Sequence, residues 1–109
     1  MRSKFLGLLT MCRRAGKIEF GYDASNRAAQ AGKIFCIITA ADLSARTKKE
    51  SHFIGDKYSI PVIESGFTME ELARELGRPG GVFGIADKGF AAGFVKIDED
   101  MKSHNGVQI

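Results

Sequence analysis

The residues in this sequence with the chemistry to hold a ligand are arginines and lysines that lie beside glycine-rich turns. The segment GYDASNRAAQAGK, residues 21–33, begins with glycine, carries Arg27 one turn inside a run of small residues, and ends with glycine and lysine. The first N–H groups of a helix are free and the helix dipole is positive there, so such a start suits phosphates and base edges. Small side chains would let a bulky partner approach that backbone. We therefore interpret residues 21–27 as a candidate anion-binding helix start.

Residues suited to catalysis or metal binding are sparse. His52 and His104 are isolated, and no nucleophile stands beside a general base. Cys12 and Cys36 are far apart and form no CxxC pair, which predicts reduced thiols rather than a disulfide or a zinc site. The run GRPGGVFGIADKGFAAG is rich in glycine but matches neither GxxxxGK[ST] nor GxGxxG. The sequence therefore predicts a protein that is not an enzyme and has no cofactor and no metal; a nucleotide-holding enzyme is the weakest alternative.

Charge is distributed unevenly along the 109 residues. Residues 1–58 carry 11 Lys and Arg against 5 Asp and Glu, whereas residues 59–109 carry 5 against 8, for a net charge of +3. A basic half favours a polyanionic partner, although a solvated basic surface explains the charge equally well. No apolar run approaches the roughly 20 residues that span a bilayer, and Arg13 and Arg14 interrupt the apolar N-terminus. We expect a cytoplasmic protein with no membrane partner.

Hydrophobic periodicity predicts helices that alternate with short strands. The continuous apolar runs in KIFCIITAAD, SIPVIES and VFGIAD predict buried strands, and Pro61 places the second of them near an edge or at a strand start. A very short strand is expected at residues 17–20. Helices are expected at about residues 3–15, 23–31, 43–58, 68–77 and 89–97. Thr68 and Glu71 have the spacing of a capping box at the start of the fourth helix, and Gly77 is expected to stop it. Together these elements predict one α/β domain over residues 1–97, a three-layer α/β/α sandwich with a central mixed sheet of about four strands, and a polar, frayed tail over residues 98–109.

The ends of these elements bear on the candidate site. In an alternating α/β sandwich, strand C-termini and helix N-termini often gather on one edge. At such an edge the sequence offers residues 21–27, TAAD (39–42) and GRPGG (77–81). We expect these segments to meet in a shallow basic surface. For Ala28 and Ala31, close packing of a helix on the sheet is the better explanation of the small side chains.

The order of the segments AGK, GYDASNRAAQAGK, IFCIITAAD, SARTKK, IPVIE, ELARELGR and VFGIADKGFA resembles the ribosomal protein L-seven-Ae and L-thirty-e family, and more closely a small bacterial subgroup of it, over about residues 3–97. The resemblance implies an α/β/α sandwich that binds RNA, and the best-known members recognise kink-turns. In them a Gly-x-Asn-Glu-x-x-Lys segment at a helix start and the loop after Leu-Gly make the contacts. Here Asp23 replaces the asparagine, Ala24 the glutamate and Arg27 the lysine.

The predicted RNA contacts combine this helix start with the two neighbouring loops. They are Gly21, Tyr22, Asp23, Ala24, Arg27, Lys33, Asp42, Leu76, Gly77, Arg78 and Gly80. Compared with the family's segment, Arg27 keeps the positive charge that would face a phosphate, whereas Asp23 and Ala24 lose the groups that would contact bases. Phosphate contacts carry little sequence information. We therefore expect a monomeric, non-catalytic protein that binds structured RNA, such as ribosomal RNA or a kink-turn, in translation or in association with the ribosome. Its kink-turn specificity should be altered or weakened.

The alternative is a protein-interaction module of the translation apparatus. Its contacts would come from apolar side chains in the loop regions, Phe67 and the segment from Phe83 to Phe90, rather than from arginines.

Overall fold

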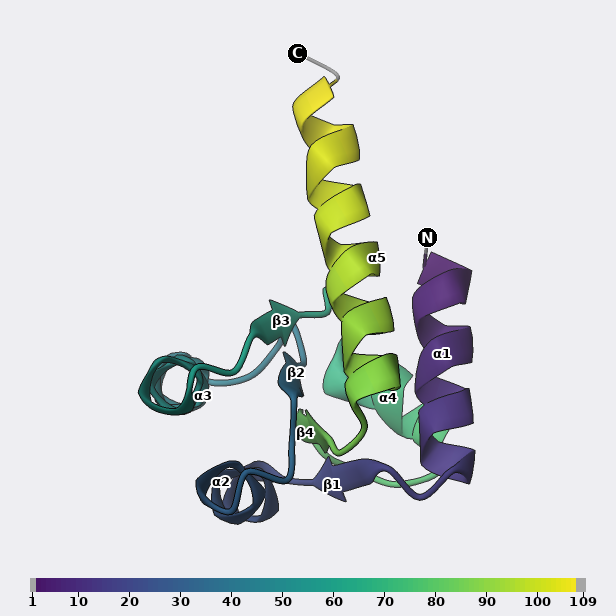
Figure 1. Cartoon of the computed structure of the whole chain (residues 1–109). Helices are drawn as coiled ribbons and strands as arrows, with labels where there is room; N and C mark the ends of the chain where they lie inside the picture. The colour runs from purple at the N-terminus through teal and green to yellow at the C-terminus, as the bar shows by residue number, and fades with distance from the viewer. Residues whose placement is uncertain (1, 108–109) are drawn as a thin grey trace.

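The structure, a computed structural model, describes residues 2–107, with side-chain surroundings given for residues 3–102. Five helices and four strands alternate along this part of the chain (Figure 1). They are α1 (Arg2–Arg14), β1 (Ile18–Phe20), α2 (Tyr22–Gln30), β2 (Cys36–Thr39), α3 (Ala45–Tyr58), β3 (Val62–Glu64), α4 (Met69–Leu76), β4 (Val82–Ile85) and α5 (Lys88–Val107). The predicted three-layer sandwich with a four-stranded mixed sheet is confirmed.

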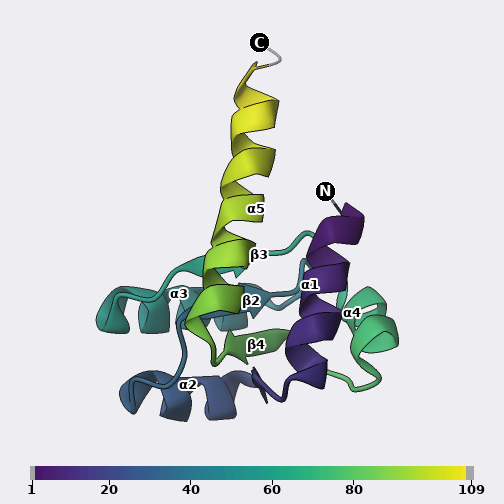
Figure 2. The same cartoon turned by 45° about the vertical axis from the view of Figure 1, so that its right-hand side comes forward.

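The two faces of the sheet are covered differently. Helices α2 and α3 lie on one face, and α1, α4 and α5 lie on the other (Figures 1 and 2). The larger core forms on the second face, where the aromatic ring of Phe5 packs 5.7 Å from that of Phe67 and 5.0 Å from that of Phe94. The smaller core forms under α2 and α3, and the buried residues of α2 there are the small side chains of Ser25, Ala28 and Ala29. Helix α2 therefore lies on the sheet with little side-chain bulk beneath it.

The sheet order is β1-β4-β2-β3. Strand β4 runs antiparallel to both β1 and β2, with Phe20 opposite Phe83 and Thr39 opposite Val82, while β2 and β3 are parallel. The C-terminal ends of β1, β2 and β3 and the start of β4 therefore meet at one edge of the sheet, which we call the rim.

Local sequence signals account for most of the element boundaries. Strands β2 and β4 are buried throughout, as expected for the two central strands, and β3 is an edge strand that starts directly after Pro61. Helix α4 begins at Thr68 with the predicted capping box, in which Glu71 donates its backbone N–H to the Thr68 side chain and accepts from the Thr68 N–H. It ends at Gly77, whose φ of 67° lies in the left-handed region.

Helix α5 is longer than the sequence analysis predicted. The expected end near residue 97 was wrong, because the helix continues to Val107 and projects beyond the sheet (Figure 1). Two contacts extend it: Met101 packs against the core one turn after Ile97, and Lys102 pairs with Asp98 at 3.0 Å. Residues 98–107 of the expected polar tail are therefore helical, and residues 108–109 lie outside the described residues. No helix in the described part of the chain is both long and apolar enough to cross a membrane.

Candidate nucleic-acid interface

Three segments that are distant in sequence meet at the rim. Gly21, directly after β1, donates its N–H to the carbonyl of Val82 at 2.8 Å. Ala40, directly after β2, donates to the carbonyl of Gly81 at 2.8 Å, and Ala41 donates to that of Phe67 at 2.7 Å. The start of α2, the segment after β2 and the loop between α4 and β4 thus lie side by side because the strand register brings them there.

The N-terminus of α2 is open. Its N-cap is Gly21, with φ 97° and ψ 163°, and no side chain bonds to the first turn. Asp23 lies inside the first turn and does not cap the helix. Since the first N–H groups of a helix have no partner within the helix, the amides of Tyr22, Asp23 and Ala24 face the rim without a side-chain acceptor. Burial, followed by the carboxylates of Glu50 and Asp23, raises the pKa of Tyr22 above its ordinary value.

The loop from α4 into β4 supplies the second part of the rim. Gly77 and Gly80 both have positive φ, 67° and 154°, and Arg78 between them is exposed. Leu76 was predicted as a contact, but its side chain is buried in the core and only its carbonyl reaches the surface layer, where Arg13 Nε donates to it. Figure 2 shows this loop beside the C-terminal end of α1.

The aromatic ring of Phe20 stacks against Arg78, the arginine of this loop. The guanidinium of Arg78 lies 4.3 Å from the centre of the Phe20 ring, and that of Arg13 lies 5.5 Å from the same point. Phe20 itself packs edge-on against Phe83, with ring centres 5.8 Å apart. The sequence analysis did not select Arg13 or Phe20 as contacts, and it used Arg13 only as a charge that interrupts the apolar N-terminus. The position of Phe20 at the end of a strand leading into Gly21 was the available signal.

Arg27 and Lys33 lie along the flank of α2 rather than at its start. Together with Glu19, Ala24, Ala28 and Ala31 they line a shallow hollow of about 260 Å³. Lys33 precedes β2 and therefore lies at the edge of the sheet opposite the rim. Ala28 packs under the helix as predicted, but Ala31 is exposed because it is the C-cap residue, so the packing explanation was wrong for Ala31.

Asp42 lies at the rim but is engaged there. Its Oδ1 accepts the N–H of Met69 at 2.8 Å, which closes the start of α4. The first turn of α4 is therefore satisfied by Asp42 and by the capping box, whereas the first turn of α2 is not.

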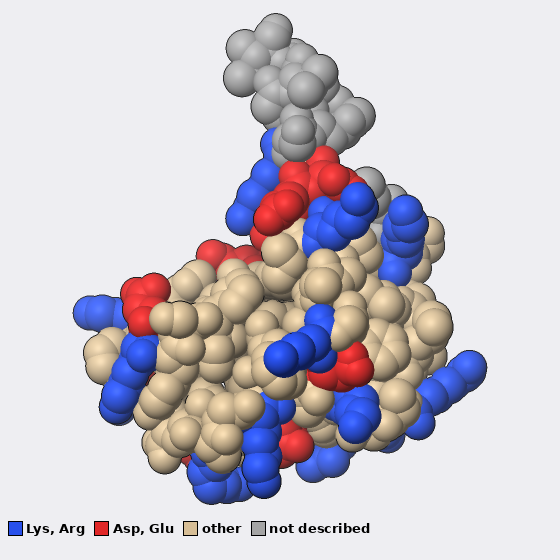
Figure 3. Space-filling model, viewed as in Figure 1, with Lys and Arg blue, Asp and Glu red and all other residues tan. Residues whose placement is uncertain are grey.

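The basic side chains near the rim lack carboxylate partners. Within the described residues, Arg13, Arg27 and Arg78 form no ion pair; the pairs seen there lie within α3, α4 and α5 or join His52 to Glu64. On the face drawn in Figure 3, basic side chains dominate the lower part, over α2 and β1, and carboxylates gather on α5. Unpaired guanidinium groups in water are suited to bind phosphates.

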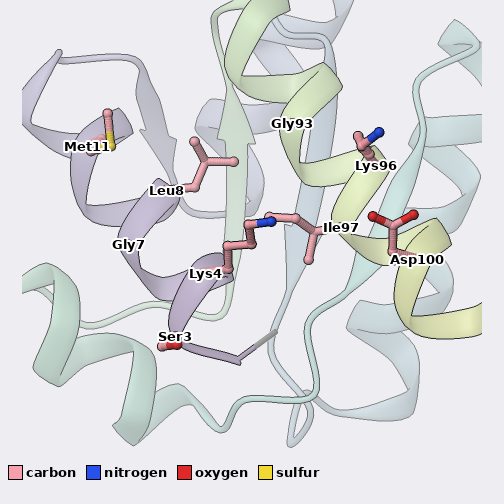
Figure 4. A pocket seen from close by; sticks show the side chains of 9 residues that line it. All are labelled: Ser3, Lys4, Gly7, Leu8, Met11, Gly93, Lys96, Ile97 and Asp100. Atoms are coloured by element: carbon pink, nitrogen blue, oxygen red, sulfur yellow. The ribbon is translucent and has the colours of Figure 1, made fainter. Parts of the chain in front are cut away.

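Two other parts of the molecule bear on the alternative functions. Phe67 and Phe83, named for a protein-interaction module, are buried in the core and unavailable for docking. An open apolar hollow of about 480 Å³ lies between α1 and α5, where Gly7 and Gly93 leave space between the helices and Leu8 points into it (Figure 4). No three His, Cys, Asp or Glu side chains gather into a metal-binding group in the part of the chain searched.

Solved structures share the class of fold that the rim and the sandwich define. A protein of unknown function from Bacillus halodurans aligns with a TM-score of 0.82 and 28% identity, covering 87% of this chain and 96% of that one. The 15.5kD RNA binding protein of Giardia lamblia aligns with a TM-score of 0.69 and 20% identity, covering 89% and 86%. The chain is thus an α/β/α sandwich of the type found in both.

Sequence similarity gives the family. The RNA-binding protein YlxQ of Enterococcus faecium is 33% identical to this chain over 90 residues, which are 83% of this chain and 86% of YlxQ. No protein-family model matches the sequence. The chain belongs to the same family as YlxQ.

Proposed function

We propose that this protein binds structured RNA at the rim and does not catalyse a reaction. The observation that carries the proposal is the juxtaposition of the open N-terminus of α2 with the exposed Arg78 on the neighbouring loop. A relative that is 33% identical to this chain is named as RNA-binding, which supports RNA as the polyanion. We also assign the family to the class of ribosomal proteins L-seven-Ae and L-thirty-e, and expect it to act in the cytoplasm, in translation or on ribosomal RNA.

The proposed contacts divide by chemistry. The amides of residues 22–24 and the guanidinium groups of Arg27 and Arg78 would bind phosphates, and Lys33 would extend the track along α2. Gly21, Gly77 and Gly80 would shape the backbone, and Asp42 would hold the neighbouring α4 in place. Asp23 and Ala24 lack the amide donor and the carboxylate that the resemblance associates with kink-turn reading, so specificity should be weaker than affinity.

The test is titration of a kink-turn RNA and of a plain RNA duplex of equal length at several salt concentrations. Loss of one phosphate contact lowers the slope of log affinity against log salt by about 0.9 on a duplex, taking the duplex DNA value as a guide. Arg27→Ala should weaken binding about tenfold at low salt, the loss of one charge-assisted contact, and flatten the slope by that amount.

Lys102→Ala is the control. Lys102 is an exposed cation in the C-terminal part of α5 that pairs with Asp98 at 3.0 Å, and none of the segments that form the rim contains it. Its removal should change neither affinity nor slope appreciably. If the wild-type protein binds neither RNA at low salt, the proposed function is wrong.

A further inference from the structure

The C-terminal end of α1 carries two neighbouring arginines beside the rim. Arg13 and Arg14 are both exposed and, with Thr10 and Glu75, line an open hollow of about 470 Å³ between the ends of α1 and α4. Neither arginine pairs with Glu75 or with another carboxylate within the described residues. This hollow is distinct from the flank of α2 that holds Arg27 and Lys33.

Two contacts fix Arg13 before any ligand arrives. Its Nε donates to the carbonyl of Leu76 at the negative end of α4, and its guanidinium lies over the Phe20 ring. A guanidinium has five N–H donors, so one bond to Leu76 leaves the terminal nitrogens free for an anion. Because the side chain is already ordered, less rotamer entropy is lost when it binds.

The same ring joins this hollow to the rim. Arg78 lies over Phe20 at 4.3 Å and Arg13 at 5.5 Å, so one aromatic side chain holds a cation from each site. Phe20 directly precedes Gly21, the N-cap of α2. Two cations held near one ring without a carboxylate repel each other, and a bound phosphate would remove that repulsion.

We propose that Arg13, Arg14 and Arg78, the arginine cluster, bind a second backbone phosphate of the RNA, next to the one held at the start of α2. The proposal rests on the proposed function and extends it to residues on α1 that the fold places beside the rim. The RNA would run from the start of α2 across Phe20 to the end of α1. A phosphate fits better than a peptide carboxylate because the cluster is continuous with the rim through Phe20 and Gly21.

The experiment measures RNA affinity against salt for the full chain, with the kink-turn RNA and the plain duplex as probes. Arg13→Ala should weaken binding of both RNAs about tenfold and flatten the salt slope by about 0.9. Arg14→Ala, which removes no bond seen within the protein, should act in the same direction and separates a binding effect from a folding effect. Thermal unfolding of each variant checks that the fold is retained.

A second variant tests the role of the ring. Phe20→Leu keeps every charge and most of the apolar bulk but removes the stacking surface. We expect affinity to fall about threefold with the salt slope unchanged, because the cations remain but are no longer held. A structural role of Phe20 alone would instead lower thermal stability and leave the affinity of the folded protein unchanged, which would overturn its assignment.

The outcomes separate this inference from the proposed function. If the wild-type protein binds neither RNA, the proposed function fails as a whole. If RNA binds and Arg27→Ala flattens the slope, but Arg13→Ala and Arg14→Ala both keep the wild-type slope, the arginine cluster is not a phosphate site. Binding of a polyglutamate peptide that depends on Arg13, with unchanged RNA affinity, would assign the cluster to an acidic protein and also overturn the proposal.

Discussion

The N-termini of α2 and α4 lie at the same rim, yet the two helix starts are built in opposite ways. The start of α4 is closed by the Thr68–Glu71 capping box and by Asp42, and the helix is anchored by the buried side chain of Leu72. The start of α2 has a glycine cap and no side-chain acceptor, and alanines form its buried apolar contacts. Side chains of the protein itself therefore occupy the backbone N–H groups at one helix start, whereas the other has no side-chain cap.

The largest expected effect comes from changing the glycine cap of α2. Gly21 has φ 97° and ψ 163°, a combination essentially restricted to glycine, so Gly21→Ala should cost about 1–3 kcal/mol of unfolding free energy. A Cβ there meets no atom within 4 Å, so the cost is in the backbone and would be relieved by moving the start of α2. We therefore also expect Gly21→Ala to bind RNA more weakly. Chemical denaturation measures the loss of unfolding free energy, and RNA titration measures the loss of affinity.

Gly7→Ala is the matched control for that experiment. Gly7 is exposed within α1, and a Cβ there also meets nothing within 4 Å. Because an alanine is favoured over glycine inside a helix, this change should stabilise the protein by about 0.5–1 kcal/mol. Equal loss of stability in both variants would contradict the strain argument for Gly21.

The second prediction restores polar groups at the open start. Asp23→Asn with Ala24→Glu returns the amide and the carboxylate that the resembled family carries at these positions. One base contact adds about 1–3 kcal/mol of discrimination in DNA readout, so the affinity ratio of kink-turn to plain duplex should rise about tenfold. Asp56→Asn on the exposed side of α3 is the control and should leave the ratio unchanged. An unchanged ratio in the double variant would mean that specificity is set elsewhere.

The third prediction opens the closed helix start. Thr68→Ala removes the side chain that accepts from the N–H of Glu71, and loss of such a cap costs about 1 kcal/mol. Thermal unfolding should detect this loss. RNA affinity of the folded protein should not change, because Asp42 still occupies the first turn of α4. Stronger RNA binding by the variant would show that closure of α4, rather than the loop beside it, limits the site.

Local patterns in the sequence predicted many of the features that distinguish the two helix starts and the strands beside them. The capping box at Thr68, the helix stop at Gly77 and the burial of β2 and β4 are each determined within a few residues, by backbone donors, by φ and by apolar runs. Gathering of three loops at one edge followed from alternation of helices and strands. These features depend on residues that are close in sequence or on a general rule of topology, and both can be predicted from a single sequence.

The features that were missed depend on partners far away in sequence. Arg13 bonds to Leu76, and Asp42 bonds to Met69. No local pattern indicates which distant backbone group a side chain will reach once the strands have paired. The burial of Leu76 and the place of Lys33 beyond the far end of α2 follow from the packed structure in the same way. The sequence identifies where the helices start, but the register of the paired strands determines which other segments each helix start contacts.

The smallest expected effect concerns the phenol of Tyr22 at the open helix start. Its pKa is raised above its ordinary value by burial first, then by the carboxylates of Glu50 and Asp23. The neutral phenol is thus favoured in the fold, so its contribution to stability is complete below the unfolded value of 10.0 and is lost as pH rises through the folded pKa. The protein has two tyrosines, so replacing Tyr58 with phenylalanine leaves Tyr22 as the remaining tyrosine. The change of tyrosine absorbance with pH in that variant gives the titration midpoint of Tyr22. Glu50→Gln should lower that titration midpoint more than Asp23→Asn does. Glu70→Gln on α4 is the control and should leave the midpoint unchanged. If Glu50→Gln also leaves the midpoint unchanged, carboxylates do not act on the start of α2.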